Sequence, residues 1–349
     1  MAVNLAKYCA VPVLRLFANP FPSTSTDVVS RSLPLSTNTA RSGLLFIAAA
    51  VIFWGVMPVA LKLTVGFVDA VNLTWFRFGA AGLILLVFQT LAGGLAPFKQ
   101  VTKRQWGWLA LAGLMLLANY LAYMVALKYL APGTAQLNFQ TSGVFLAIGG
   151  FLVFGERLTR FQIGCFVALA VGMLMFFNPY LHFDGGAEGG NVLLGVMLIQ
   201  LSVLCWCVSV LLQRQLAGVL SPTNILLVIY LLGAIVLLPV CDFSVWQPLD
   251  GESWTIVIAS AVATLLAYAC FAQGMKSLPA GQVGAMLSLT PIISFISTDM
   301  LVYAGWWRDI LQVGELNLLS KLGIGVIVLA VMSVQLKPKT QQTMNKSVS

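Results

Sequence analysis

Residues 106–128 read WGWLALAGLMLLANYLAYMVALK, and residues 254–276 read WTIVIASAVATLLAYACFAQGMK. Each stretch is long and apolar enough to cross a bilayer as an α-helix, which takes about 20 residues. Their landmarks coincide, because Trp106, Tyr120 and Lys128 recur 148 positions later as Trp254, Tyr268 and Lys276. We therefore predict that the chain contains two copies of one membrane-embedded unit.

The repetition continues on both sides of these stretches. Trp54 and Lys62 recur 152 positions later as Trp206 and Arg214. Gly155-Glu156, followed by Gly164, recurs as Gly314-Glu315, followed by Gly323.

Ten apolar stretches of spanning length follow residue 42. We expect them at residues 43–62, 72–93, 106–127, 133–153, 160–178, 191–213, 222–240, 254–273, 280–303 and 320–336. Five spans in each copy is an odd number, so the second copy must lie upside down relative to the first, as in many secondary transporters. The predicted fold class is an all-α polytopic membrane protein, with ten transmembrane helices in two inverted five-helix repeats. The repeats are expected at 43–178 and 191–336, with tails at 1–42 and 337–349.

The composition excludes a water-soluble domain. Hydrophobic residues make up 59% of the 349 residues, charged residues only 9%, and the mean hydropathy is +0.93. Soluble domains carry roughly 25% charged residues. The six cysteines are expected to be small buried residues, and His182 is the single histidine, so no metal site and no cofactor are expected.

Lysine and arginine predict the orientation, because cytoplasmic segments of membrane proteins are enriched in both. With the N-terminus inside, 14 of them fall in inner segments and 4 in outer ones, and Arg77 lies within a span. This distribution explains the net charge of +8 without a nucleic-acid partner. A plasma (inner) membrane location is favoured. Residues 1–42 are basic and rich in Ser, Thr and Pro; they form either a disordered tail or a transit peptide, and a transit peptide would indicate an organelle membrane.

Several short motifs resemble the drug/metabolite transporter superfamily, in particular its EamA branch. They are Phe-Gly-Glu-Arg-Leu-Thr at 154–159 before Gly164 and Gly172, Trp54-Gly55 with Pro58, Arg77 at the head of the second span, Ala126-Leu127-Lys128-Tyr129, and Leu289-Thr290-Pro291. The resemblance covers residues 43–336 and implies ten helices, a central cavity, and export or exchange of small metabolites. The first copy departs from the family where it has Ser142-Gly143 in place of Thr290-Pro291, which leaves open whether both halves bend alike.

Polar and aromatic side chains within the spans are expected to line the cavity, because polar groups in a bilayer usually face the protein interior. In the fourth span, Thr134, Asn138 and Ser142 share one helical face, and Gln136 and Gln140 share a neighbouring one. The candidate substrate-binding residues, drawn from spans 1, 3, 4, 6, 8 and 9, are Trp54, Asn119, Tyr120, Tyr123, Asn138, Thr141, Ser142, Trp206, Tyr268, Ser288 and Thr290. For these residues, packing between helices is the alternative role.

Arg77 and Asp299 are the charged residues inside spans, and both are coupling candidates. A buried pair would satisfy both charges, and a protonatable Asp299 would couple transport to a proton gradient. The alternative is that both side chains snorkel to the membrane surface.

The sequence therefore predicts a secondary-active transporter, an exporter or exchanger of small metabolites such as amino acids, that works by alternating access. The alternative within the superfamily is a sugar-phosphate or nucleotide-sugar exchanger, which would need several buried cations. A membrane-embedded enzyme is a remote alternative, because the spans hold no histidine and no paired acids. The expected partners are a small-molecule solute and the lipid bilayer, and a homodimer is left open.

Overall fold

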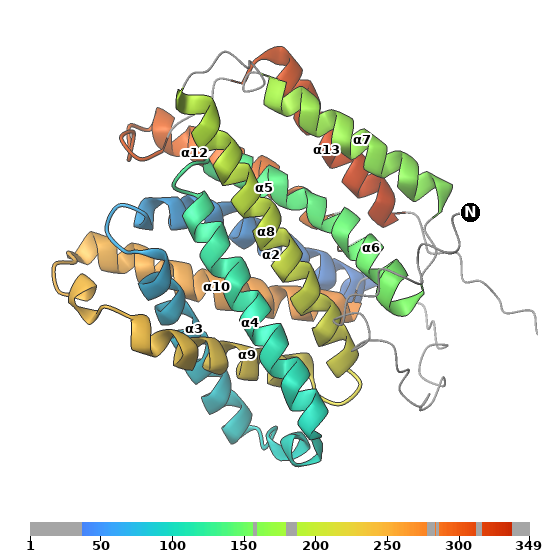
Figure 1. Ribbon diagram of the computed structural model, residues 1–349, viewed down its shortest axis with the longest axis vertical. Helices are drawn as coiled ribbons and strands as arrows, with labels where there is room; N and C mark the ends of the chain where they lie inside the picture. Colours follow the sequence, from blue (N-terminus) through green and yellow to red (C-terminus); the bar gives the residue numbers. More distant parts are fainter. Residues whose placement is uncertain are drawn as a thin grey trace, which may run out of the picture.

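The computed structural model describes residues 37–155, 159–178, 187–277, 283, 286–311 and 316–336. These residues form helices and contain no strand (Figure 1). The main helices are α2 (Thr37–Thr64), α3 (Ala70–Leu91), α4 (Lys103–Ala126), α5 (Pro132–Asn138), α6 (Ser142–Phe154), α7 (Arg160–Phe177), α8 (Ala187–Leu216), α9 (Pro222–Leu237), α10 (Gly251–Ser277), α12 (Thr290–Tyr303) and α13 (Leu318–Leu336). The predictions for residues 1–36 and 337–349 lie outside the described residues.

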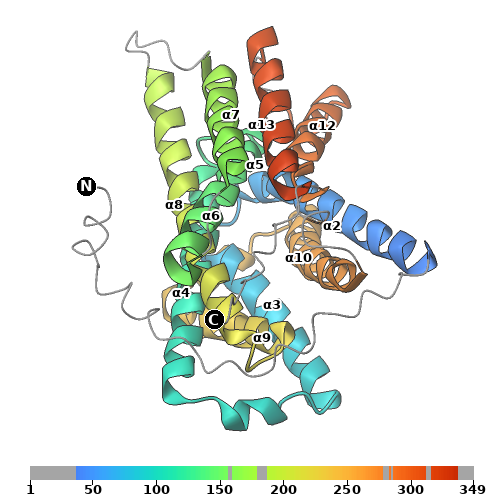
Figure 2. The same ribbon diagram turned by 90° about the vertical axis from the view of Figure 1, so that its right-hand side faces the viewer.

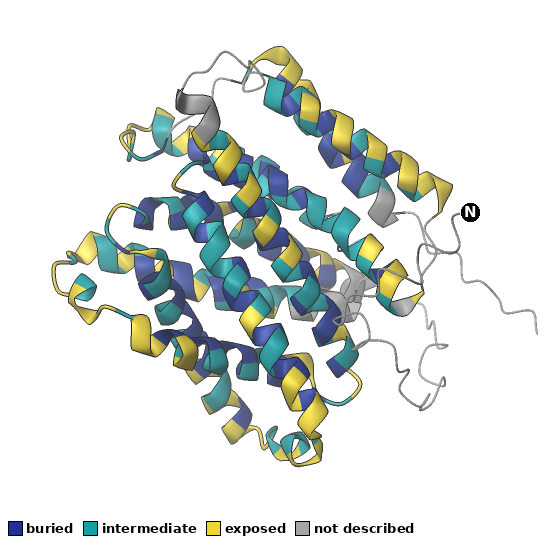
Figure 3. Ribbon diagram, viewed as in Figure 1, coloured by how far each residue is buried: buried dark blue, intermediate teal, exposed yellow. Residues whose placement is uncertain are grey.

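Seven helices of the described chain are long and apolar enough to cross a membrane: α2, α3, α4, α7, α8, α9 with the short turn that follows it, and α10. The helices α12 and α13 are apolar but shorter. Large apolar side chains such as Val167 and Leu174 of α7 face outward, with exposed fractions of 59% and 62% (Figure 3). Water would oppose such a surface and lipid favours it, so the chain is an integral membrane protein.

The expectation of a continuous fourth span at 133–153 is wrong. Helix α5 ends at Asn138, a 3-10 turn follows at Phe139–Thr141, and α6 begins at Ser142. Side chains accompany this break: the Asn138 amide donates to the Thr134 carbonyl oxygen (2.9 Å), and the Thr141 hydroxyl donates to the Asn138 carbonyl oxygen (2.9 Å). Such local bonds compete with the regular helical pattern.

The ninth span is interrupted at the matching place. Its helix α12 begins only at Thr290, with Pro291 in the first turn, where a missing N–H costs little. Pro291 therefore lies where the helix of the ninth span is broken, whereas Pro58 lies within α2. Both copies are thus interrupted here, one with a proline and one without.

Helix pairing is reciprocal between the two copies. The repeat relates α2 to α8 and α4 to α10. The pair α2–α10 therefore corresponds to the pair α8–α4, and both pairs are in contact. The pairs α3–α9 and α7–α13 are unchanged by the exchange. Figures 1 and 2 show α7 and α13 side by side at one edge of the bundle.

Glycine permits the closest of these contacts. A Cβ atom on Gly323 of α13 would lie 2.7 Å from the Gly172 carbonyl oxygen of α7. A Cβ atom on Gly233 of α9 would lie 2.3 Å from the Phe78 ring of α3. Small residues at these positions let the backbones approach, which is how helices commonly pack within a membrane.

Candidate functional site

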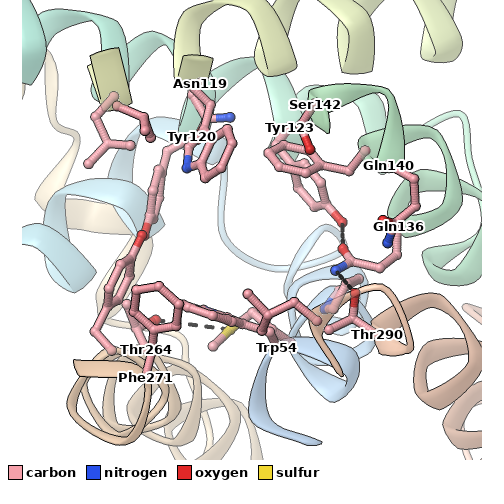
Figure 4. A pocket seen from close by; sticks show the side chains of 18 of the residues that line it. Trp54, Asn119, Tyr120, Tyr123, Gln136, Gln140, Ser142, Thr264, Phe271 and Thr290 are labelled. Carbon is pink, nitrogen blue, oxygen red and sulfur yellow. Dashed lines mark hydrogen bonds between the residues drawn. The ribbon is translucent and has the colours of Figure 1, made fainter. Parts of the chain in front are cut away.

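A central cavity of about 520 Å³ lies between the two copies (Figure 4). Its volume is in the range of small-molecule sites, which measure about 300–1,000 Å³. The described helices α2, α3, α4, α5, α6, α8, α9, α10, α12 and α13 all contribute to its wall. Helices α3, α9 and α13 were not expected there.

The cavity wall consists largely of residues that the sequence repeat relates to one another. At the spacing of 152, the lining pairs are Trp54/Trp206, Pro58/Val210 and Leu61/Gln213. At the spacing of 148, they are Leu116/Thr264, Tyr120/Tyr268, Tyr123/Phe271, Phe139/Leu287, Gln140/Ser288 and Ser142/Thr290. Equivalent positions of the two copies therefore line the same cavity.

Aromatic rings cover much of this wall. The Trp54 ring lies 5.3 Å from both the Tyr268 ring and the Phe271 ring, measured between centroids. The Trp206 ring lies 5.5 Å from the Phe139 ring, and the Tyr123 ring lies 6.0 Å from the Phe139 ring, again between centroids. Edge-to-face arrangements of this kind hold aromatic side chains in fixed positions.

One hydrogen-bonded chain crosses from the first copy to the second. The Tyr123 hydroxyl donates to Gln136 Oε1 (3.0 Å), and Gln136 Nε2 donates to Thr290 Oγ1 (3.0 Å). Figure 4 shows Gln136, Gln140, Ser142 and Thr290 together on one side of the cavity. We call this group the amide wall.

Arg77 of α3 lies on the opposite side. Its Nη2 atom donates to Thr264 Oγ1 (2.8 Å), and its guanidinium carbon lies 4.9 Å from the centroid of the Tyr120 ring. Figure 4 shows Tyr120 and Thr264 across the cavity from the amide wall. Arg77 is the only charged side chain among the described residues that line the cavity.

The repeat mate of Arg77 is apolar. Helices α3 and α9 are capped at Asp69 and Ser221, which lie 152 positions apart. The same spacing relates Arg77 to Ile229. The charge of the cavity is therefore contributed by one copy alone.

The structure places nine of the eleven candidate substrate-binding residues in the cavity wall. They are Trp54, Asn119, Tyr120, Tyr123, Ser142, Trp206, Tyr268, Ser288 and Thr290. Asn119 also donates to the Ser202 backbone oxygen (3.0 Å) and hydroxyl, so its amide joins α4 to α8.

Asn138 and Thr141 do not line the cavity. The Asn138 side chain is fully buried, and the Thr141 hydroxyl also lies 2.9 Å from Gln200 Oε1 of α8. Gln136, Gln140 and Ser142 line the cavity on this span. Of the predicted face of Thr134, Asn138 and Ser142, Ser142 lines the cavity and the other two do not.

Asp299 lies away from Arg77. The buried residues of α12 include Ser294 and Thr298, and Asp299 follows them on the exposed side of the helix. Among the described residues, no carboxylate forms an ion pair with Arg77, so the predicted buried pair is not present.

Sequence reasoning missed Thr264 and Phe271 as lining residues. Both lie on the α10 face that carries Tyr268. Applying the spacing of 148 to Tyr123 would have found Phe271, because the repeat relates the two positions.

A helical membrane bundle with a central cavity formed from two repeated halves defines the class of polytopic membrane transporters. The chain matches the model of the EamA-like transporter family twice, at residues 41–178 and 193–335, and it belongs to that family.

Relatives from bacteria carry transporter names. The chain is 29% identical to an uncharacterized transporter of Haemophilus influenzae, over 82% of this chain and 92% of that protein. It is 28% identical to the uncharacterized inner membrane transporter YhbE of Escherichia coli K12, over 84% of this chain and 91% of YhbE. A solved crystal structure is similar with a TM-score of 0.58 at 20% identity, covering 84% of this chain and 97% of that one, and this likeness concerns the fold alone.

Proposed function

We propose that the protein is a secondary-active transporter that exports or exchanges small metabolites by alternating access. In this proposal, its ten spanning segments form two inverted five-helix repeats that rock around the central cavity. The observation that carries the proposal is the cavity wall itself, because most of its lining residues are repeat mates at the spacings of 152 and 148. Sites at the interface of inverted repeats are typical of such carriers.

The charge of the cavity favours small solutes with at most one net negative charge, amino acids among them. A sugar phosphate or nucleotide sugar carries two or more negative charges and would need several cations. Arg77 is the single cation among the described lining residues, and the Lys128 side chain is exposed outside the cavity. The sugar-phosphate alternative is therefore the less favoured one.

We place the protein in the plasma (inner) membrane, with both termini inside. The lysine and arginine distribution supports this orientation. YhbE, which is named as an inner membrane transporter, supports the location.

The test is uptake of radiolabelled amino acids and sugar phosphates into liposomes that contain the purified protein. Gly143 lines the cavity, and a Cβ atom there would meet no atom within 4 Å, so Gly143→Phe should fill the cavity without a backbone clash. Gly164→Phe is the matched control, because Gly164 is exposed and also has open space around its Cβ position. Saturable uptake that Gly143→Phe abolishes and Gly164→Phe retains is the expected result. Equal uptake by both variants would contradict transport through this cavity.

A further inference from the structure

Arg77 is a buried cation with no counter-ion among the residues that the structure describes. Its exposed fraction is 4%, and its hydrogen bonds are to Thr264 Oγ1 and weakly to the Met57 sulfur. Its Nε atom is buried and has no hydrogen-bond partner. A buried charge is costly unless a partner neutralises it, so this guanidinium favours an anionic group in the cavity.

A carboxylate is the complementary group. The guanidinium presents its N–H donors in a planar fork that matches the two oxygens of a carboxylate, and such charge-assisted bonds are stronger than neutral ones. The Thr264 hydroxyl and the Tyr120 ring hold the guanidinium at one wall of the cavity.

The rest of the cavity is neutral. The amide wall offers carboxamide and hydroxyl groups opposite Arg77, and the rings of Trp54 and Phe271 lie along the wall that connects them. No acidic side chain is found among the described lining residues. An ammonium group next to the carboxylate of a solute would therefore lie near Arg77 without an anionic partner.

We propose that the cavity selects solutes with a single carboxylate, held by Arg77, and an apolar or aromatic body that extends toward the amide wall. This inference rests on the proposed function and deepens it by naming the solute class. Hydroxy and aryl carboxylates bind more tightly than the corresponding α-amino acids. Arg77 is the residue that determines this specificity.

The experiment is isothermal titration calorimetry on the full-length protein in lipid nanodiscs, with three probes of the same body: phenyllactate, its methyl ester, and phenylalanine. We expect phenyllactate to bind and both other probes to bind at least about tenfold more weakly, since a hydrogen bond to a charged group is worth that much or more. Equal binding of acid and ester, tighter binding of phenylalanine, or no binding of any probe would overturn the proposal. This comparison uses the wild-type protein, so it does not depend on the folding of a variant.

Arg77→Gln provides the second measurement. It removes the positive charge. We expect the affinity of this variant for phenyllactate to fall to the affinity of the wild type for the methyl ester. Lys128→Gln is the control, because it also removes a positive charge but its side chain is exposed and lies outside the cavity. Undiminished phenyllactate binding by Arg77→Gln would overturn the assignment. If binding is as expected but liposomes show no uptake or exchange of phenyllactate, the proposed transport function fails while the carboxylate site stands.

Discussion

Gln136 and Thr290 join the two interrupted segments of the chain across the cavity. Gln136 lies on α5, three residues before the 3-10 turn begins, and Thr290 is the first residue of α12. The Gln136 amide donates to the Thr290 hydroxyl over 3.0 Å, so the two copies are hydrogen-bonded where both are broken.

Removing this bond should weaken the contact between the copies. We expect Gln136→Leu and Thr290→Val each to lower stability by about 1 kcal/mol, the usual net contribution of a hydrogen bond. The double variant should lose less than the sum, because both changes remove the same bond. Thermal unfolding of the four proteins in detergent measures this coupling, and strict additivity would show that the bond contributes nothing.

Lys62 connects the end of α2 to the turn between α4 and α5. Its Nζ atom donates to the backbone oxygen of Leu127 and, over 3.3 Å, to that of Leu130. We expect Lys62→Met to free this turn, at a cost of about 1 kcal/mol or more for the lost charged bonds. Hydrogen exchange of residues 127–131 should rise in this variant.

Lys128→Met is the matched control for Lys62→Met. Lys128 lies in the same turn, but its side chain is exposed. Its replacement should leave exchange unchanged, and an equal rise in both variants would argue against a specific role for Lys62.

The backbone contact between α7 and α13 should tolerate no side chain at Gly323. A Cβ atom there would lie 2.7 Å from the Gly172 oxygen and 2.7 Å from the Phe176 nitrogen. Gly323→Ala should therefore cost about 1–3 kcal/mol through overpacking. Gly325→Ala on the same helix should be neutral or stabilising, because a Cβ atom at Gly325 meets nothing within 4 Å. Equal melting temperatures of the two variants would contradict the close approach.

Asn138→Ala should lower the stability of the protein without changing solute binding. The Asn138 amide bonds to the Thr134 carbonyl oxygen and lies outside the cavity. We expect this variant to lose about 1 kcal/mol of stability and to bind the solute as the wild type does. Gln140→Leu, on the cavity wall, should instead weaken binding more than stability. Titration calorimetry and thermal unfolding of both variants make the comparison, and weakened binding by Asn138→Ala would restore it to the site.

The sequence predicted much of the cavity wall because the repeat preserves landmark residues such as Trp54 and Trp206. Those landmarks mark equivalent positions, and equivalent positions of the two copies line one cavity. The interruption after Asn138 could not be read from apolar periodicity, since residues 133–153 are apolar enough for one continuous helix. Side-chain bonds to backbone oxygens accompany it, and a pattern of residue types does not reveal them.

The exposed position of Asp299 could not be predicted from the sequence either. Its neighbour Thr298 is buried, and a single position along the helix decides between the interior and the surface. Because α12 begins at Thr290 rather than near residue 280, its rotational setting could not be predicted from the span as a whole.

The difference between Arg77 and Ile229 has a consequence for how the two halves could have diverged. A chain assembled from two first halves would place two guanidinium groups in one small cavity, and a chain assembled from two second halves would place none there. The first would suit dianionic cargo and the second uncharged cargo. A change at one position in one half of a duplicated carrier is thus enough to reset the charge of what it moves.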